Sequence, residues 1–303
     1  MDAATTPTAD PRTSVVMITR DRREEVLRTL ERLSALPERP PLTVVDNASS
    51  DGTADAVRRA FPQVLVVALG TNLGAAGRNI GVDRAATPYV AFCDDDSWWA
   101  PGALARVADA FDAHGRLAVV QGHILVGAEE RDDPVCAQMA DSPLPAAPEL
   151  PGRAIASFVA CVAAVRRSAF REVGGFDRRF LVGGEEEHLS ADLASAGWAL
   201  SYLPEALGHH HPPKAAPRHD RRRIGIRNAL WFAWLRRPLR SALRRTWDMA
   251  RRVPKDRISA LAFLDAARGL PWVVRERRVV PPPVEHTYRL LDAPQMRART
   301  YRS

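Results

Sequence analysis

The sequence predicts an α/β fold: a doubly wound, mostly parallel sheet followed by a helical C-terminal extension. In the N-terminal third, short β-branched runs alternate with stretches of helical periodicity, which is typical of parallel sheets with crossover helices. In the C-terminal third, arginines and large apolar side chains recur at helical spacing. At 303 residues, with 46% hydrophobic and 26% charged residues, the chain is long enough for one large α/β domain and an appendage.

Four predicted strands lie in the N-terminal third, and polar residues follow their ends. They are residues 14–19, 42–46, 64–68 and 89–93. A helix is predicted over residues 22–36, where Val26 and Leu30 recur at helical spacing. A short helix is expected to end near Pro62, and a third to begin within residues 72–82. Ligands bind beyond the carboxyl ends of strands in such sheets, so the polar groups there are functional candidates.

The middle of the chain is less regular. Prolines and polar groups in residues 127–152 predict a long loop, and residues 155–165 read as a buried strand. The other predicted elements are a helix over 101–114, a strand over 117–126, a helix over 185–196, a strand-like segment over 200–203, and basic helices over 221–235 and 239–252.

Charge and composition indicate the domain plan and the compartment. Residues 218–257 hold 14 Lys and Arg against 3 Asp and Glu, whereas residues 1–217 hold 21 against 29. We therefore expect a flexible tail (1–12), an acidic body (13–217) and a basic, mainly helical extension (218–303). No apolar run reaches the roughly 18–20 residues that span a bilayer. The N-terminus lacks a secretory pattern, and the three cysteines lack metal-ligand spacing, which together predict a cytoplasmic protein with reduced thiols.

Three aspartates directly follow the fourth predicted strand: Asp94, Asp95 and Asp96. Carboxylates at the end of a buried strand are costly to desolvate unless a cation compensates them. Their hard oxygen ligands suit Mg²⁺ or Mn²⁺, which also bind phosphate oxygens. The alternative is a solvated acidic turn that caps the next helix.

Polar groups also follow the second and third predicted strands. Asp46 ends the second strand, where it either begins a turn or accepts a hydrogen bond from a ribose or base. After the third strand, Asn72 begins a stretch in which Gly74 lets the backbone approach a ligand closely. Arg78 adds a cation suited to a diphosphate. The stretch is not the dinucleotide-binding fingerprint, because it follows a third strand and lacks that spacing and the downstream acid.

An ordered set of four motifs resembles a known family. In this order, VDNASSDGT, NLGAAGRNIG, FCDDDSWW and GGEEEHLSADLASAGW look like a family 2 glycosyltransferase of GT-A fold. The resemblance covers roughly residues 13–235. It implies transfer of a sugar from a nucleoside diphosphate donor, with a divalent metal, Mn²⁺ or Mg²⁺, held by an Asp-x-Asp motif.

The resemblance implies a donor site and a metal site in this chain. Asp46 falls on the nucleotide-contacting acid, and Arg78 falls near the nucleotide. Asp94 and Asp96 fall on the Asp-x-Asp motif, with Asp96 the stronger candidate for a direct metal ligand. The other implied donor contacts are Thr19, Arg20, Asn72, Gly74, Asp94 and Asp95. Related sequences commonly read Thr-Tyr-Asn where this chain has Thr19 and Arg20, so that contact departs from the pattern.

The resemblance also implies a catalytic base on the helix that begins at residue 185. Glu186 aligns with this base, with Glu in place of the commoner Asp, and Glu185 is the alternative. His188 replaces another acid that is frequent in the family. Such a carboxylate takes the proton of an acceptor hydroxyl as it attacks the anomeric carbon. Without the other motifs, three glutamates here would indicate only a solvated helix N-terminus.

A run of three histidines follows the predicted base helix. Related enzymes often place a metal- or diphosphate-contacting histidine in this region, and we favour His209 or His211 over His210. The alternative is a plain surface loop. Imidazole combined with carboxylates suits Mn²⁺ at least as well as Mg²⁺.

The basic segment 221–257 allows three interpretations. Cations interleaved with Trp and Leu fit a helix on an anionic membrane surface, which a lipid-linked acceptor would explain. They also fit helices packed on the catalytic domain with a solvated basic face. Contact with nucleic acid is the third and least favoured interpretation.

We therefore predict a cytoplasmic, metal-dependent, inverting glycosyltransferase that is peripheral on the inner face of the cell membrane. The expected donor is a UDP- or dTDP-sugar, and the expected acceptor is a glycan, a lipid-linked molecule or a small molecule; no nucleic-acid partner is expected. One alternative is a sugar nucleotidyltransferase, but its glycine-rich loop after the first strand is missing from residues 18–25. The other is a non-catalytic nucleotide-sugar or glycan-binding module that has lost its base.

Overall fold

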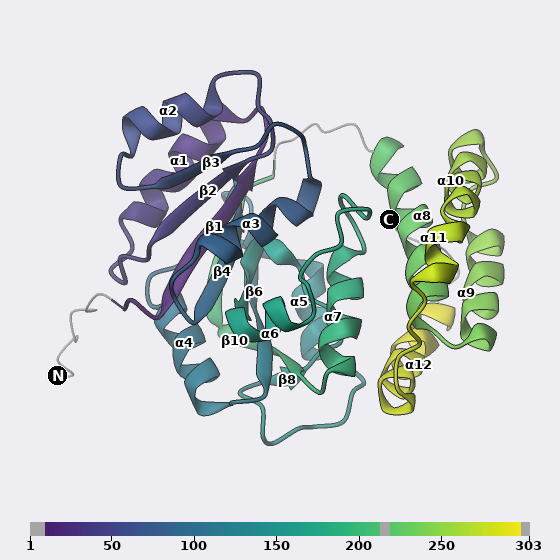
Figure 1. Ribbon diagram of the computed structural model, residues 1–303. Helices are drawn as coiled ribbons and strands as arrows, with labels where there is room; N and C mark the ends of the chain where they lie inside the picture. The colour runs from purple at the N-terminus through teal and green to yellow at the C-terminus, as the bar shows by residue number, and fades with distance from the viewer. Residues whose placement is uncertain (1–9, 213–218, 298–303) are drawn as a thin grey trace.

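The computed structural model describes residues 10–212 and 219–297 (Figure 1). Residues 1–9 of the expected tail and the expected boundary at 217 lie outside the described residues. The described strands form one ten-stranded mixed sheet, whose main path is β3-β2-β1-β4-β9-β6-β10-β5. Its strands are β1 Thr13–Thr19, β2 Leu42–Asp46, β3 Leu65–Ala68, β4 Tyr89–Asp94, β5 Ser97–Trp99, β6 Leu117–Val126, β7 Arg131–Asp132, β8 Arg153–Ala154, β9 Ala163–Arg166 and β10 Ala199–His210.

The first four strands are parallel, and β1 pairs with both β2 and β4. Helices α1 (Arg23–Ser34) and α2 (Thr53–Ala60) pack against each other, because the chain moves in one direction across the sheet from β1 to β3. The chain then returns past β1 to β4 through α3 (Gly77–Arg84), which packs against β1 and β2 (Figure 1). The strand order therefore reverses between β1 and β4, where doubly wound sheets bind ligands.

The second half of the sheet is mixed, with β9 antiparallel between β4 and β6, and β10 parallel to β6. The expected strand over 155–165 is wrong in extent, because a 3₁₀ turn, η2 (Ala160–Val162), precedes the short β9. Gln121 holds this turn: its side chain accepts from the Val159 N–H at 2.6 Å and donates to the Val162 carbonyl at 2.8 Å. An apolar run indicates burial, and periodicity alone does not separate a buried strand from a buried turn.

Residues 127–152 are not one long loop. They contain β7 and the helix α5 (Pro134–Ala140), whose N-cap Asp133 accepts from the Val135 N–H at 2.9 Å. Pro134 occupies the first helical turn, where the N–H that proline lacks has no intrahelical partner to lose. The first proline of the segment therefore begins a helix rather than a loop.

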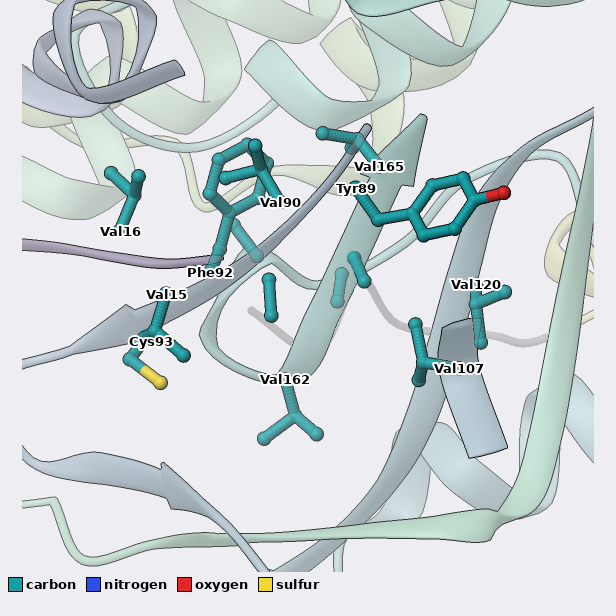
Figure 2. Close-up of a cluster of buried hydrophobic side chains, with 14 of the residues drawn as sticks. Val15, Val16, Tyr89, Val90, Phe92, Cys93, Val107, Val120, Val162 and Val165 are labelled. Carbon is teal, nitrogen blue, oxygen red and sulfur yellow. The ribbon is translucent and has the colours of Figure 1, made fainter. Parts of the chain in front are cut away.

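The main hydrophobic core lies along the sheet and beneath its covering helices. Figure 2 shows valines and Phe92 from β1, β4, β6, β9 and η2 gathered with Val107 of α4 (Ala103–Ala113). Val15 and Val16 are neighbours on β1 that point to opposite faces, yet both are buried. Both faces of the sheet are therefore covered, as a central parallel strand requires.

The C-terminal extension is helical and has a core of its own. Its helices are α8 His219–Arg236, α9 Leu239–Arg252, α10 Arg257–Arg268, α11 Leu270–Arg275 and α12 Pro282–Arg297. They follow α6 (Arg167–Glu172) and α7 (Glu185–Ser195), and α8 lies between α7 and the outer helices α9 and α10 (Figure 1). The second core includes Phe180 and Ala191 as well as side chains of the extension. Within the described ranges, no helix is long and apolar enough to cross a membrane.

Candidate active site

The carboxyl ends of β1, β2 and β4 bring three predicted site residues to one edge of the sheet. In the strand registers, Thr19 is opposite Asp46, and Ile18 is opposite Asp94. Thr19, Asp46 and Asp94 therefore lie at the point where the strand order reverses, although 75 positions separate the first from the last along the chain. This edge is the expected ligand crevice.

Asn47, which the sequence indicated only as a turn residue, fixes the loop after β3. Its side chain donates to the Gly74 carbonyl at 3.2 Å and accepts from the Leu73 N–H at 3.1 Å. The neighbouring Asp46 is buried and accepts from the Ser49 N–H at 2.8 Å, while Asn72 accepts from the Gly74 N–H at 2.8 Å. These bonds give the loop a defined shape before α3 begins.

Gly74 brings this loop against the segment that precedes α7. Its φ is +58°, and a Cβ there would lie 2.2 Å from the Leu181 carbonyl oxygen. The same oxygen accepts a hydrogen bond from the Ala75 N–H at 2.7 Å. Only glycine allows this approach, so the glycine-rich stretch joins the β3–α3 loop to the start of the predicted base helix.

Arg78 connects the aspartate turn with α7. Its guanidinium is buried, forms an ion pair with Asp94, and lies 5.8 Å from the Phe92 ring centroid. Burial raises the pKa of Glu186; the Arg78 charge lowers it and the Asp94 charge raises it. The Arg78 charge also lowers the pKa of Glu185. The strand-end carboxylate and the α7 carboxylates therefore share one electrostatic environment around a single buried cation.

Asp95 faces the interior of the protein. Its carboxylate accepts from the Thr19 hydroxyl at 2.9 Å, and its carbonyl accepts from the Thr29 hydroxyl at 2.7 Å. Burial raises the pKa of Asp95 to about 7, against the opposing charge of Arg22. Thr19 and Asp95, both predicted donor contacts, thus hold each other and anchor the turn that presents Asp94 and Asp96.

Asp96 contacts the end of β10. Its carboxylate lies 3.1 Å from the Arg22 guanidinium and 3.5 Å from Nε2 of His210, and its carbonyl accepts from the His211 N–H at 2.8 Å. Arg22 was not among the predicted site residues. The predicted Arg20 is exposed and pairs at 3.4 Å with Asp21 in its own turn.

The histidine beside Asp96 is the one that we favoured least from the sequence. Strand β10 continues through His210, so alternation places His209 on the opposite face from His210. His209 stacks on Trp98, with ring centroids 5.1 Å apart, and faces Glu130 at 3.3 Å; the His211 ring also packs on Trp98. The sequence prediction ended this strand near residue 203, so the alternation of side chains that separates His209 from His210 could not be predicted.

The three glutamates at the start of α7 lie in different surroundings. Glu185 is buried, and burial together with Glu186 raises its pKa to about 9; its Oε2 has no hydrogen-bond partner among the described residues. Glu186 is less buried, with Oε1 3.5 Å from the Ala160 amide nitrogen. The Glu187 carbonyl accepts from the Tyr288 hydroxyl at 3.4 Å, on the side of the extension. His188 packs against Phe180 at 4.8 Å between ring centroids.

Asn228 of α8 holds the loop that leads into α7, a role that none of the sequence motifs predicted. Its buried amide donates to the carbonyls of Phe180 at 2.8 Å, Val182 at 3.2 Å and Gly183 at 2.5 Å. The extension is therefore bonded directly to the segment that sets the position of Glu185 and Glu186. The sequence does offer one indication of this role. Asn228 is an amide among Ile226, Ala229 and Leu230, and a buried amide needs hydrogen-bond partners.

The side chains around Asp96 suit a divalent cation whose coordination shell is completed by the substrate. Among the described residues, no three His, Cys, Asp or Glu side chains converge on one metal position. Asp96 and His210 nevertheless offer a carboxylate and an imidazole within 3.5 Å of each other, next to Asp94 in the same turn. Mg²⁺ and Mn²⁺ sites commonly use few protein ligands and complete their shells with water and phosphate oxygens.

A family model and several known proteins match the chain. The model for glycosyl transferase family 2 matches residues 14–174, which is more than half of the chain. An N-acetylglucosaminyl-diphospho-decaprenol L-rhamnosyltransferase of Mycobacterium tuberculosis is 27% identical over 271 residues, which cover 76% of this chain and 88% of the relative. A pre-mycofactocin glycosyltransferase of the same species is 33% identical over 145 residues, covering 45% of this chain and 29% of the relative.

Solved structures match the fold at low sequence identity. The mannosyltransferase PcManGT from Pyrobaculum calidifontis, in complex with GDP-Man and Mn²⁺, aligns with a TM-score of 0.60 and 21% identity, over 98% of this chain and 79% of that one. GalNAc-T7 with UDP, GalNAc and Mn²⁺ aligns with a TM-score of 0.56 and 15% identity, over 90% and 57%. Both neighbours have the GT-A fold, which confirms the predicted fold class.

Proposed function

Because the chain belongs to glycosyl transferase family 2, we propose that it transfers a sugar, with inversion, from a nucleoside diphosphate donor to a hydroxyl of a lipid-linked acceptor. The relative with the long alignment is named for action on a diphospho-decaprenol-linked N-acetylglucosamine, which supports a polyprenyl-diphosphate-linked sugar as the acceptor class. We keep a UDP- or dTDP-sugar as the proposed donor. An acceptor of this kind lies in a bilayer, so the proposal places the enzyme as a peripheral protein on the inner face of the membrane.

The observation that carries the proposal is that one buried cation, Arg78, acts on both carboxylate groups of the site. It pairs with Asp94 at the end of β4, and its charge acts on Glu185 and Glu186 at the start of α7. A buried cation that acts on both groups suits a site that binds a donor diphosphate and activates an attacking hydroxyl. A plain acidic turn and a solvated helix end would not need this shared buried charge.

We assign proton transfer to Glu186. Its carboxylate takes the proton of the acceptor hydroxyl as the oxygen forms a bond to the anomeric carbon. The bond from that carbon to the diphosphate oxygen breaks on the opposite side, so the configuration inverts and the nucleoside diphosphate leaves with the bonding electron pair. Burial raises the pKa of Glu186, which makes it a stronger base once it is deprotonated. Glu185, with its pKa raised to about 9, keeps its proton at neutral pH and spares the site a second charge.

Asp96, with His210 and Asp94 beside it, would hold Mn²⁺ or Mg²⁺, and such an ion stabilises the negative charge of the leaving diphosphate. Arg22 contacts the same Asp96 carboxylate and Arg78 contacts Asp94, so these arginines orient the two side chains. Asn47 and Gly74 shape the loop that would lie along the nucleotide.

A binding screen with UDP-, dTDP- and GDP-sugars, with and without Mn²⁺, tests this function. We expect tight binding of one donor class that weakens at least tenfold without the metal. Binding of none of the donors, or binding that ignores the metal, contradicts the proposal. Formation of sugar nucleotide from a nucleoside triphosphate and a sugar phosphate would identify a nucleotidyltransferase instead, and metal-dependent binding without transfer to any acceptor would identify a binding module.

A further inference from the structure

Helix α9 packs between contacts to α8 and α12 and leaves its remaining side exposed. It contacts α8, and its buried side chains are Ser241, Ala242 and Met249. The Ser241 hydroxyl donates to the Glu285 carboxylate of α12 at 2.6 Å, and Arg245 pairs with Asp292 of α12 at 3.1 Å. Figure 1 shows α9 on the far side of α8 from the sheet.

The opposite side of α9 carries a continuous strip of large apolar side chains. Leu239, Leu243 and Trp247 are 57%, 52% and 64% exposed. They are four residues apart, so they lie one above the other along the helix. Single exposed apolar residues are normal on a protein surface, but a strip of three that includes a tryptophan indicates a contact surface.

Exposed arginines border this strip. Arg240, Arg244 and Arg251 are exposed, and the Arg251 guanidinium lies 6.0 Å from the Trp247 ring centroid. Arg244 also lies 3.4 Å from the Asp292 carboxylate of α12, at the edge of the strip, and its side chain stays 46% exposed. The one acidic residue of α9, Asp248, is partly buried. We define the α9 face as these six exposed residues: Leu239, Arg240, Leu243, Arg244, Trp247 and Arg251.

We propose that the α9 face binds the surface of an anionic lipid bilayer. Leucines and a tryptophan enter the boundary between headgroups and acyl chains, while the neighbouring arginines meet anionic headgroups. A nucleic acid would use the arginines and leave the two leucines in water. A second copy of α9 across a two-fold axis would bring arginines against arginines, which is unfavourable. The bilayer is therefore the one partner that matches both halves of the face.

This inference adds a membrane-contacting surface to the proposed function. It rests on that function for one point only, which is why the enzyme would approach a lipid surface: to reach a lipid-linked acceptor. Helix α8 connects the α9 face to the proposed active site, because α9 packs on α8 and Asn228 of α8 holds the loop before Glu185. A bilayer bound at α9 would thus be attached to the same helix that supports the proposed base.

Vesicle flotation of the full chain tests the proposal without any sugar or acceptor. Vesicles of phosphatidylcholine mixed equally with phosphatidylglycerol should carry the protein, whereas vesicles of phosphatidylcholine alone should carry at least tenfold less. Binding should weaken when the ionic strength is raised from about 0.1 M to about 1 M, where the Debye length falls to about 3 Å. The triple variant R240Q/R244Q/R251Q should bind about a hundredfold more weakly, from roughly fivefold for each arginine.

A matched pair of variants distinguishes vesicle binding by the apolar strip from non-specific hydrophobic adsorption. The double variant L243S/W247S should lose at least tenfold in binding, while Leu65→Ser, at an exposed leucine of β3, should bind like the wild type. All six substituted positions are exposed, so folding should be unchanged by circular dichroism. The proposal is overturned if wild-type protein ignores the anionic vesicles, if L243S/W247S binds them normally, or if duplex DNA displaces the vesicles. Donor binding is measured separately, so failure of this inference and failure of the proposed function are distinguishable.

Discussion

Arg78, buried at the start of α3, forms an ion pair with Asp94 at the end of β4. The aspartate turn is thus bonded to a cation whose charge also lowers the pKa of Glu185 and Glu186 on α7. One side chain connects the donor side of the site to the acceptor side, so its replacement should affect both.

Arg78→Met should lower kcat/KM for sugar transfer by about 10²–10³-fold. The reason is that it removes the fixed positive charge that would face the leaving diphosphate, and frees Asp94 from its partner. Arg84→Met, at an exposed arginine of the same helix, is the control and should leave transfer within twofold. Equal effects of the two substitutions in a steady-state assay would show that Arg78 has no special role.

His210→Ala should raise the Mn²⁺ concentration needed for half-maximal donor binding by about tenfold or more. His210 is the histidine next to Asp96, whereas His209 stacks on Trp98 and faces Glu130. His209→Ala is therefore the matched control, and its Mn²⁺ titration should follow that of the wild type. If the two variants exchange these behaviours, the metal position lies on the other face of β10.

Asn228→Ala should lower the free energy of unfolding by about 2–3 kcal/mol, because three carbonyls in residues 180–183 lose a buried donor. At a temperature where the variant is folded, kcat should fall at least tenfold and the donor affinity should fall less, because the loop leads directly into Glu186 and reaches the proposed nucleotide loop through the Leu181 carbonyl. Denaturant titration and separate measurement of kcat and Kd check the two parts. An equal loss of donor affinity would indicate a general structural role.

His188 should make stability depend on pH. Burial lowers its pKa to about 4 from an ordinary 6.5, so the unfolded chain binds the proton more tightly than the folded one. Its stabilising neutral form is fully present above pH 6.5 and is lost as the pH falls toward 4, with a total effect of about 3 kcal/mol. The nearby Asp192 and Asp177 favour the charged ring, whereas Arg236 and Arg179 oppose it.

The comparison with His188→Gln isolates this effect, because both proteins keep Glu185 and Glu186. The free energy of unfolding of the wild type minus that of the variant, measured by urea titration, should decrease steadily between pH 6.5 and pH 4. A difference that stays constant over this range would mean that the ring is not buried in its neutral form.

The sequence predicted the parts of the site that depend on strand ends and missed those that depend on packing. Parallel strands end at one edge of the sheet, so Asp46 and Asp94 could be placed together from hydropathy and order alone. His210 required the true length of β10, which runs past the bulge between Leu203 and Leu207 where the prediction stopped. Long-range contacts such as that of Asn228 with the loop before α7 leave only a weak local signal.

The same distinction explains the errors in the middle of the chain. The apolar run at 155–165 shows that the segment is buried, but the side chain of Gln121 determines that it turns. The proline content of residues 127–152 predicts a loop at Pro134, yet its position directly after Asp133 is that of a first helical turn. Neither outcome follows from hydropathy alone.

Transfer and donor binding by Glu186→Gln, compared with the wild type and with Glu187→Gln, test the central claim most directly. Glu186→Gln keeps the size and hydrogen-bonding capacity of the side chain but cannot accept the proton, so transfer should fall by about 10²–10⁴-fold while the donor Kd stays within twofold. Burial raises the pKa of Glu187 and the charges of Arg245 and Arg237 lower it, so its side chain acts on the extension and should be replaceable by glutamine with little effect on transfer. Full transfer activity in Glu186→Gln would contradict the account, because the proton of the acceptor would then leave by another route.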